Sequence, residues 1–282
     1  MGKYLDVGGQ AVIEGVMMKS KKRIVTSVRA GKKIISKKRE FVPVTERNRI
    51  LRLPVIRGMV GLFEMLVVGM QELTWSADQQ TSEKEGKLSG FQLFLTFAFA
   101  IGAVILMFVI APYYLTKVFV KDVNVVFNLI DGLFRVVIFI IYLLAIGLMA
   151  DMRRVFQYHG AEHKTVNCYE AGKKLIVANV KKYSVIHPRC GTSLIVFVLI
   201  ISILLFSLIK SSTAYINIPL RIVLIPLIAG IAYEIVKLSV RFKRNILLRI
   251  LVWPGLMTQK LTTREPNEKQ IEVAITSLKK VL

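Results

Sequence analysis

All three histidines and both cysteines of this 282-residue chain lie in one short stretch of the sequence. Imidazole and thiolate are the side chains that zinc prefers as ligands. The run HGAEH, from His159 to His163, has the H-x-x-E-H order of inverzincin metal sites. On a helix, residues four apart lie on the same face. We therefore predict that His159 and His163 bind Zn²⁺, or another divalent metal, and that Glu162 acts as the general base of a hydrolysis.

A hydrolytic zinc site of this type needs a third protein ligand and leaves one coordination position open. The run HPRCG, residues 187–191, resembles a zinc knuckle in which His replaces the first Cys. Glu234 is another source of a ligand, because a carboxylate in a membrane span is expensive and usually functional. Its competing role is an ion pair with Lys237 or Arg241. The candidates for the remaining metal ligands are Cys168, His187, Cys190 and Glu234.

Two other interpretations of this stretch remain open. Cys168, His187 and Cys190, together with one upstream histidine, would complete a closed tetrahedron, which is typical of a purely structural zinc site. Alternatively, Cys168 and His163 would form a nucleophile and base pair, although the sequence identifies no third group to orient them. The sequence alone therefore predicts a metal site, with catalysis and a structural role as its two alternatives.

The rest of the chain is predicted to be a membrane scaffold. A mean hydropathy of +0.55 accompanies a net charge of +22, a combination that is rare in soluble enzymes. A helix that crosses the hydrocarbon core needs about 20 mostly apolar residues. Four stretches reach or approach that length: 91–111, 132–150, 191–209 and 218–236. We predict a mostly α integral membrane protein with about four transmembrane helices, further interfacial helices and a small basic β-rich unit at the N-terminus.

The distribution of Lys and Arg predicts the orientation, because the cytoplasmic flanks of short loops retain positive charge. The segments before the first span, between the second and third, and after the fourth hold 35 of the 40 basic residues. Both termini and the His/Cys stretch are therefore expected on the cytoplasmic side. A transporter is disfavoured, because the spans contain few buried charges and no paired broken helices.

The first 53 residues are predicted to form the β-rich unit. Residues 23–29 and 33–42 mix β-branched and basic residues around an Ala30-Gly31 turn, a pattern typical of a hairpin. One face would pack while the other presents cations to anionic lipid headgroups or to RNA phosphates. These cations are Lys21, Lys22, Arg23, Lys32, Lys33, Lys37, Lys38 and Arg39. Before the hairpin, Glu14 in a glycine-flanked apolar run is either a further site residue or a strand-edge residue that faces water.

Residues 54–75 are apolar at nearly every helical position except Arg57, Glu64 and Gln71, which are seven apart. Crossing the bilayer here would translocate the 14 basic residues of positions 1–54, so we expect a helix in the membrane interface. Near the C-terminus, 246–257 is also expected at the interface, and an amphipathic helix begins after a cap at Asn267. The expected segments are 1–53 (β-rich unit), 54–90 (interfacial helix and linker), 91–150 (two spans), 151–190 (metal-site loop), 191–236 (two spans) and 237–282 (C-terminal helices).

Four separated motifs resemble the YqhQ-like family of bacterial membrane proteins. They are GGQAVIEGVMM near the N-terminus, YHGAEHKTVNCYE in the middle, HPRCGTS before the third span and WPGLMTQKLTTREP near the end. The resemblance implies location in the bacterial inner membrane and a metal-dependent enzyme, since members are commonly labelled so. It also implies a link to translation, because genes of the family often neighbour genes for translation termination and ribosomal proteins. A ribosome or translocon partner is therefore the alternative to a hydrolase, with the basic hairpin as the binding surface.

Overall fold

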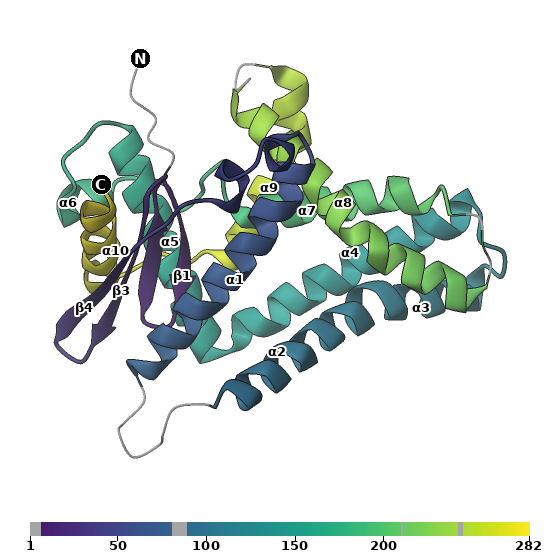
Figure 1. Cartoon of the computed structure of the whole chain (residues 1–282), viewed down its shortest axis with the longest axis horizontal. Coiled ribbons are helices and arrows are strands. Elements are labelled where there is room, and N and C mark those ends of the chain that lie inside the picture. The colour runs from purple at the N-terminus through teal and green to yellow at the C-terminus, as the bar shows by residue number, and fades with distance from the viewer. Residues whose placement is uncertain (1–6, 81–88, 210, 212, 242–244) are drawn as a thin grey trace.

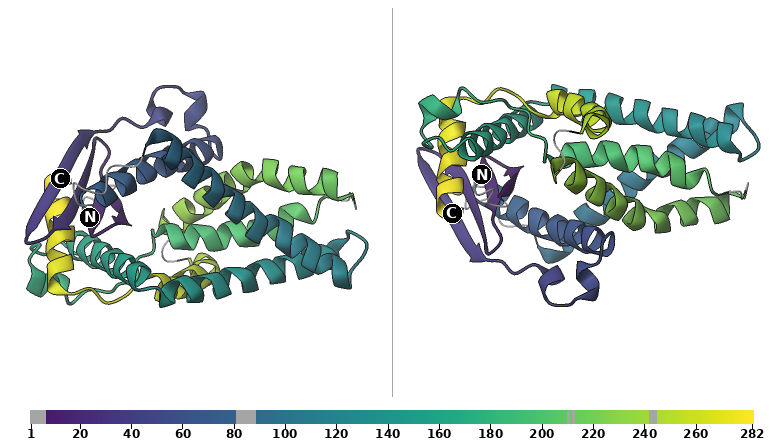
Figure 2. Two further views of the ribbon diagram at one scale, coloured as in Figure 1. Left: turned by 90° about the horizontal axis from the view of Figure 1, so that it is seen from below. Right: turned by 90° about the horizontal axis from the view of Figure 1, so that it is seen from above.

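Figure 1 shows the computed structural model of the chain, which describes residues 7–80, 89–209, 211, 213–241 and 245–282. A small sheet with packed helices lies at one end of the molecule, and long apolar helices extend from it to the other end (Figure 2). The described helices are η1 (Val44–Glu46), η2 (Ile50–Arg52), α1 (Ile56–Asp78), α2 (Gly90–Ile105), the π-helical turn η3 (Leu106–Ile110), α3 (Ala111–Phe119), α4 (Val125–Leu148), α5 (Ala150–Glu170), α6 (Val177–Val180), α7 (Gly191–Phe206), α8 (Ala214–Arg241), α9 (Ile246–Thr262) and α10 (Glu268–Val281).

The sheet is an antiparallel meander of four strands in chain order. Its strands are β1 (Gly8–Val12), β2 (Gly15–Lys19), β3 (Arg23–Ala30) and β4 (Lys33–Glu40). The hairpin expected between 23 and 42 is confirmed, with Ala30 paired to Lys33 across the turn. Gly31 has a φ of +57°, a left-handed conformation that glycine adopts without the steric penalty of a side chain.

Both faces of the sheet are covered, which corrects the expectation that one face would be free for cations. On one face, Val16 and Val25 belong to a core cluster with residues of α5 and α10. On the other face, Met17 and Ile24 pack with Val68 of α1. The sheet therefore shares its core with helices from the middle and the end of the chain, and α10 and α1 lie on its two sides (Figure 1).

Among the described residues, three helices are long and apolar enough to cross a membrane. They are Gly90–Phe119, which joins α2, η3 and α3, then Val125–Leu148, and Ala214–Ser239 within α8. The expected third span, 191–209, forms the 16-residue helix α7, which is about 24 Å long at 1.5 Å per residue. It packs beside α8 and runs in the opposite direction (Figure 1). The fold class is thus mostly helical with membrane-like helices and a small N-terminal sheet, and a fourth span is not established.

The helix expected over 54–75 forms as α1, and each residue of its polar stripe has a partner. Arg57 binds a carboxylate on α8, Glu64 accepts a hydrogen bond from the Val44 amide at 2.9 Å, and Gln71 accepts one from a guanidinium of β4. A Cβ on Gly58 would lie 2.9 Å from the Gly230 carbonyl oxygen, so the two backbones nearly touch. α1 thus leans on α8 at its start and on the sheet further along.

The cap expected for the C-terminal helix is confirmed. Asn267 accepts a hydrogen bond from the Gln270 amide at 2.9 Å, and the Gln270 side chain accepts one from the Asn267 amide at 2.9 Å. This reciprocal pair satisfies two backbone donors at the start of α10. The apolar face of the helix, with Ile271 and Leu278 fully buried, packs against β2 and β3.

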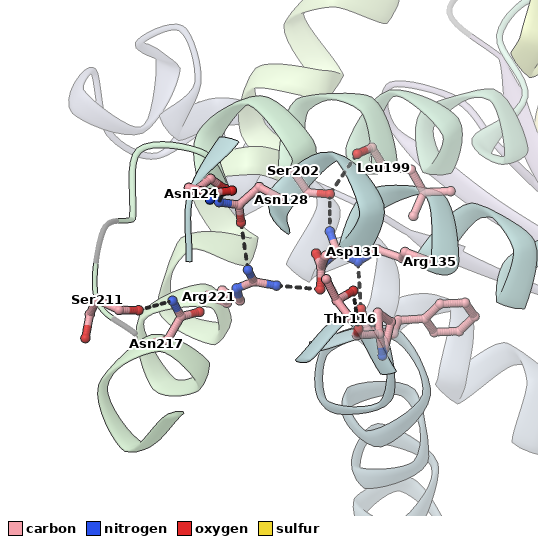
Figure 3. A network of polar contacts seen from close by, with 12 residues as sticks. Thr116, Asn124, Asn128, Asp131, Arg135, Leu199, Ser202, Ser211, Asn217 and Arg221 are labelled. Carbon is pink, nitrogen blue, oxygen red and sulfur yellow. Dashed lines mark hydrogen bonds and ion pairs between the residues drawn. The ribbon is translucent and has the colours of Figure 1, made fainter. Parts of the chain in front are cut away.

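A buried network of charged and polar side chains joins the apolar helices (Figure 3). Asp131 on α4 accepts hydrogen bonds from Arg221 of α8 at 2.8 Å and from Arg135 at 2.6 Å. Arg221 also donates to Asn128 at 2.8 Å, and Arg135 donates to Ser202 of α7 at 2.6 Å. The sequence pattern predicted few buried charges in the spans, and the structure gathers three of them, Asp131, Arg135 and Arg221, in this network.

The network holds two guanidinium groups for one carboxylate, and the local structure accommodates the excess positive charge. Arg135 donates from its Nε to the Phe108 carbonyl at 2.8 Å, inside the π-helical turn η3. The guanidinium carbons of Arg221 and Arg135 each lie 4.9 Å from the ring centroid of Phe206. Aromatic faces attract cations, most strongly where water is excluded. The carboxylate remains the central acceptor that both arginines share.

We expect Asp131→Asn to destabilise the protein strongly, because it leaves two buried guanidinium groups without a carboxylate. Removing one partner of a buried ion pair costs about 3–5 kcal/mol. Thermal unfolding of the protein in detergent micelles measures the effect. Asp122→Asn is the matched control, because Asp122 is exposed and precedes α4. A surface substitution of this kind changes the free energy of unfolding by at most about 0.5 kcal/mol. Equal melting of the two variants would contradict this role for Asp131.

Candidate metal centre

The structure brings three of the expected ligands together. His159 and His163 lie one turn apart on α5, and Cys190 is the residue that caps the start of α7. One ligand atom from each of the three lies within 4.8 Å of the other two. The Cys190 Sγ is 3.3 Å from His159 Nε2, and the two imidazole centroids are 4.3 Å apart. Two nitrogens and a sulfur that converge in this way match the ligand types of a zinc site.

Backbone carbonyls hold both imidazoles in one orientation. His159 Nδ1 lies 2.9 Å from the Thr262 carbonyl oxygen, and His163 Nδ1 lies 2.6 Å from the Val185 carbonyl oxygen. A carbonyl can only accept, so each Nδ1 carries the proton and each Nε2 keeps its lone pair. Metal-binding histidines typically donate their second ring N–H to an oxygen in this manner. The arrangement thus presents both Nε2 atoms as ligands.

The burial of His163 favours the protonation state that metal binding requires. Its imidazole is 2 % exposed, and this burial lowers the pKa of His163 below the usual value. A hydrogen bond with Cys190 opposes that shift. Because burial dominates, the ring is neutral at neutral pH, as a metal ligand must be.

Cys190 is held at the start of α7 by contacts to Thr192. Its Sγ accepts a hydrogen bond from the Thr192 amide at 3.4 Å and lies 3.3 Å from the Thr192 hydroxyl oxygen. The first amides of a helix have no partners within the helix and carry a partial positive charge.

Glu162 lies beside the three ligands in a cavity of about 100 Å³. The cavity is lined by all three ligands, by Glu162 and by His187, Arg189 and the first residues of β1. The Gly9 amide donates a hydrogen bond to the Glu162 carboxylate. The Oε2 atom of Glu162 is buried and has no hydrogen-bond partner among the described residues. Burial raises the pKa of Glu162, against the opposing effect of His159 and His187. Burying a carboxylate oxygen without a partner is unfavourable. A cation in this cavity, held by the two imidazoles and the thiol, would offset that cost.

A buried glutamine holds the loop that carries Cys190. Gln259 of α9 is fully buried and accepts a hydrogen bond from the His187 amide at 2.9 Å. Its Nε2 donates to the His187 carbonyl at 2.9 Å and to the Ser193 hydroxyl at 3.0 Å. The sequence reasoning missed this residue, although the WPGLMTQ motif contains it. The C-terminal end of α9 thus positions both Cys190, through Gln259, and His159, through Thr262.

His187 is close to the cluster but is turned to other partners. Its ring centroid is 5.7 Å from that of His163, yet its Nδ1 accepts a hydrogen bond from the Arg189 amide at 3.3 Å. Its Nε2 lies 3.6 Å from a carboxylate oxygen of Glu170, which also binds Arg189. Both ring nitrogens therefore face groups other than Cys190, and the three-residue cluster does not include His187.

Two expected ligands lie away from the cluster, which corrects those assignments. Cys168 is buried in the core between α5 and α10, its Sγ is 3.8 Å from the Lys174 carbonyl, and burial raises the pKa of its thiol. Glu234 is bound by Arg57 through both carboxylate oxygens, at 2.6 Å for the Nε contact. The competing ion-pair interpretation of Glu234 was right in kind, but the partner is on α1. The closed tetrahedron with Cys168 is not formed by the described residues.

Glu14 stabilises the fold near the site. It occupies the β1–β2 turn with a φ of +52°, and both carboxylate oxygens bind the Arg154 guanidinium. The Tyr158 hydroxyl lies 3.4 Å from the same carboxylate. These contacts join the glycine-flanked N-terminal run to the helix that carries His159 and His163.

The eight basic residues that were assigned to a nucleic-acid or headgroup surface do not form one surface. Lys37 and Arg39 point to the 1 % exposed carboxylate of Glu72 on α1, at 3.4 and 3.2 Å, which corrects their assignment to a nucleic-acid or headgroup surface. The remaining six are exposed, and they lie in the β2–β3 turn, at the start of β3, in the β3–β4 turn and in β4: Lys21, Lys22, Arg23, Lys32, Lys33 and Lys38.

We expect Gly9→Ala to destabilise the contact between β1 and α5. A Cβ on Gly9 would lie 2.6 Å from the Met17 carbonyl oxygen and 2.9 Å from the Glu162 carboxylate, so strand and carboxylate would have to move. Overpacking of this kind costs about 1–3 kcal/mol. Gly8→Ala is the control, because its Cβ would meet no atom within 4 Å. Denaturation of both variants measures the difference, and identical stabilities would show that the close approach at Gly9 is not required.

Comparison with known proteins identifies the family. Residues 53–282 match the family described as "Protein of unknown function (DUF1385)". The chain is 33% identical over 296 residues to the uncharacterized protein YqhQ of Bacillus subtilis (strain 168), covering 98% of this chain and 92% of that protein. No solved structure matches. The match confirms the resemblance inferred from the four motifs, and the chain belongs to the DUF1385 family of proteins of unknown function, together with YqhQ.

Proposed function

We propose that this chain is an integral membrane hydrolase with a zinc site on the cytoplasmic side. His159, His163 and Cys190 would hold the metal, and Glu162 would be the general base. The observation that carries the proposal is that both histidines expose Nε2 toward the sulfur of Cys190, while a buried carboxylate lines the same cavity.

The number of ligands favours catalysis over a structural role. Structural zinc sites are closed by four protein ligands, whereas catalytic sites use three and leave a position open. The described residues supply three ligand atoms within 4.8 Å of one another. The cavity of about 100 Å³ beside them leaves room for the reacting group of a substrate.

The residues of the cavity divide the hydrolytic chemistry between them. A zinc ion, when bound, would act as a Lewis acid and make a water molecule a stronger nucleophile. Glu162 would accept a proton from the attacking water, whose oxygen forms the new bond to the electrophilic carbon or phosphorus. As the bond to the leaving group breaks, Glu162 would return the proton to the departing atom. The raised pKa of Glu162 suits this second transfer, because the carboxyl holds the proton until the leaving group takes it.

The same proposal includes four spans with the metal centre and both termini in the cytoplasm of the bacterial cell. The end of α7, the start of α8 and the α3–α4 connection lie together at one end of the molecule, and the sheet and α10 lie at the other (Figure 1). This arrangement fits α7 as a short fourth crossing. The basic residues concentrate in the segments at the sheet end, which supports a cytoplasmic location for that end.

We expect His163→Ala to remove zinc from the purified protein, because His163 offers one of the three ligand atoms of the cluster. Glu162→Gln should retain zinc, because Glu162 is not among those three ligands. Elemental analysis measures the zinc content of each variant. Cys168→Ser and Glu234→Gln are the controls, and both should retain zinc because these residues have other partners. Unchanged zinc in His163→Ala would overturn the metal site.

X-ray absorption spectroscopy of the zinc protein then separates the two roles of the metal. Two nitrogens, one sulfur and a light fourth ligand that is lost on soaking with a chelating inhibitor support catalysis. Four protein ligands, or two sulfurs, would argue for a structural site.

A second function is supported by the exposed cations of the β3–β4 turn. Lys32 and Lys33 are exposed at the turn between β3 and β4. These strands lie at the end of the molecule opposite to the α3–α4 connection, away from the helices that would contact lipid (Figure 1). This position favours a soluble polyanion, such as ribosomal RNA of a ribosome near the translocon, over lipid headgroups.

We expect the double variant Lys32→Glu, Lys33→Glu to weaken co-sedimentation with ribosomes, because phosphate contacts release counterions on binding. The affinity of the unchanged protein should fall as salt is raised, and the variant should show a smaller salt dependence. The double variant Lys269→Glu, Lys279→Glu is the control for net charge, since both residues are exposed on α10 outside the turn. Binding that does not respond to salt, or that the two variants weaken equally, would count against this function.

A further inference from the structure

The apolar helices enclose a cavity of about 360 Å³ that the proposed chemistry does not use. Its walls come from α2 and η3, α4, α7 and α8, all within the apolar part of the chain. Two polar residues among them, Arg135 and Ser202, are hydrogen-bonded to each other at 2.6 Å, and Tyr142 adds an aromatic ring. The three nitrogens of Arg135 all have acceptors. The cavity therefore offers its occupant an almost entirely hydrocarbon surface.

One wall of this cavity faces the surroundings of the helices. The helix Gly90–Phe119 contains an apolar 18-residue segment, and only 6% of that segment is buried within the molecule. Ile195, which lines the cavity from α7, is 43% exposed. In a membrane, molecules that reach such an opening are lipids. Apolar cavities exclude water and accept apolar molecules.

The cavity and the candidate metal centre share helix α7. Cys190 caps this helix, and the lining residues of the cavity run from Ile195 to Phe206. At 1.5 Å per residue, the cavity begins about 8 Å from the metal ligand and ends about 24 Å from it along the axis. A chain lying in the cavity would thus end about 8 Å from Cys190 along the axis, and the head region that follows the chain would extend toward the metal centre. The metal-site cavity, at about 100 Å³, has room for a reacting group and not for a whole lipid.

The same end of the bundle carries exposed positive charge. Arg153 donates from Nε to the Gly147 carbonyl near the end of α4, at 3.1 Å. A Cβ on Gly147 would lie 4.0 Å from a guanidinium nitrogen of Arg264, and both arginine residues are exposed. Two guanidinium groups at this level complement the phosphate of a lipid headgroup.

We propose that this cavity holds an acyl chain of an anionic phospholipid, and that the lipid is the substrate whose head region reaches the metal centre. The inference rests on the proposed hydrolase function for the reaction, but the binding of the acyl chain stands on the cavity alone. Hydrolysis would follow the proton transfers given above for Glu162, with an ester or phosphodiester bond of the lipid as the bond that breaks.

The test uses the full-length protein in vesicles that contain a phosphatidylglycerol with a photoactivatable diazirine in its acyl chain. Illumination followed by mass spectrometry should place the label on the cavity-lining segments of α2 and α7. Val198→Trp fills the cavity and should abolish that label. Leu204→Trp is the matched control, because Leu204 is on the same helix, 63% exposed and outside the cavity, and should leave the label unchanged. Ile195→Trp at the exposed part of the lining serves as a second blocking variant if Val198→Trp does not fold.

Two measurements keep the failure of this inference distinct from the failure of the hydrolase. Label that persists in both blocking variants, or that spreads evenly over all apolar helices, overturns the lipid site whatever the zinc content. If the label is lost in the blocking variants, release of hydrolysis products from the same lipid without illumination, measured by mass spectrometry, should also be lost in them. His163→Ala should retain the label and release no product. Release that continues in His163→Ala overturns the metal chemistry and leaves the binding site.

Discussion

The candidate centre depends on two backbone carbonyls that orient its histidines. Two histidines four residues apart on a helix share a face, but each ring can present either nitrogen. The Thr262 and Val185 carbonyls accept from Nδ1, and only then do both Nε2 lone pairs point to Cys190. Neither carbonyl belongs to α5. The metal-binding geometry therefore exists only when the end of α9 and the loop before Cys190 are docked, and Gln259 hydrogen-bonds that loop to α9.

Close backbone approach explains why the centre is built from such distant segments. A Cβ on Gly160 would lie 2.0 Å from the Arg264 carbonyl oxygen, and one on Gly9 would lie 2.9 Å from the Glu162 carboxylate. Only glycine allows the chain after α9 and strand β1 to pack so near α5. The closeness removes water from Glu162, and this burial raises its pKa. A carboxylate buried in this way is unfavourable by itself, and a cation held by the neighbouring ligands would offset the loss of hydration.

The sequence predicted what depends on local pattern and failed where distant partners decide. The β3–β4 hairpin, the Asn267 cap and the facing pair His159 and His163 follow from spacing and turn chemistry. The ligand set does not, because Glu234 meets a partner 177 residues away in the chain, and Cys168 faces the core instead of the cluster. The sequence predicted that Lys37 and Arg39 are surface cations. In the structure, both contact the buried carboxylate of Glu72 on α1. Arg221 did not stand out in the sequence, because the mean hydropathy of the apolar run 218–236 is little changed by one charged residue. In the structure, Arg221 forms an ion pair with Asp131.

The positions of the metal ligands depend on the buried network in the apolar helices, because the same helices carry both. In lipid, the hydrophobic effect does not drive apolar side chains of different helices together. Packing alone therefore determines only weakly how far one helix is shifted along another. Hydrogen bonds are directional, and the bond from Arg135 to Ser202 ties α4 to α7 at one register. α4 continues into α5 after Met149, and α7 begins at Cys190. A slip of one turn between α4 and α7 would move Cys190 by about 5.4 Å relative to His159, more than the 3.3 Å that separates their ligand atoms. The polar contacts deep in the helices thus help to set whether sulfur and imidazole can share one metal ion.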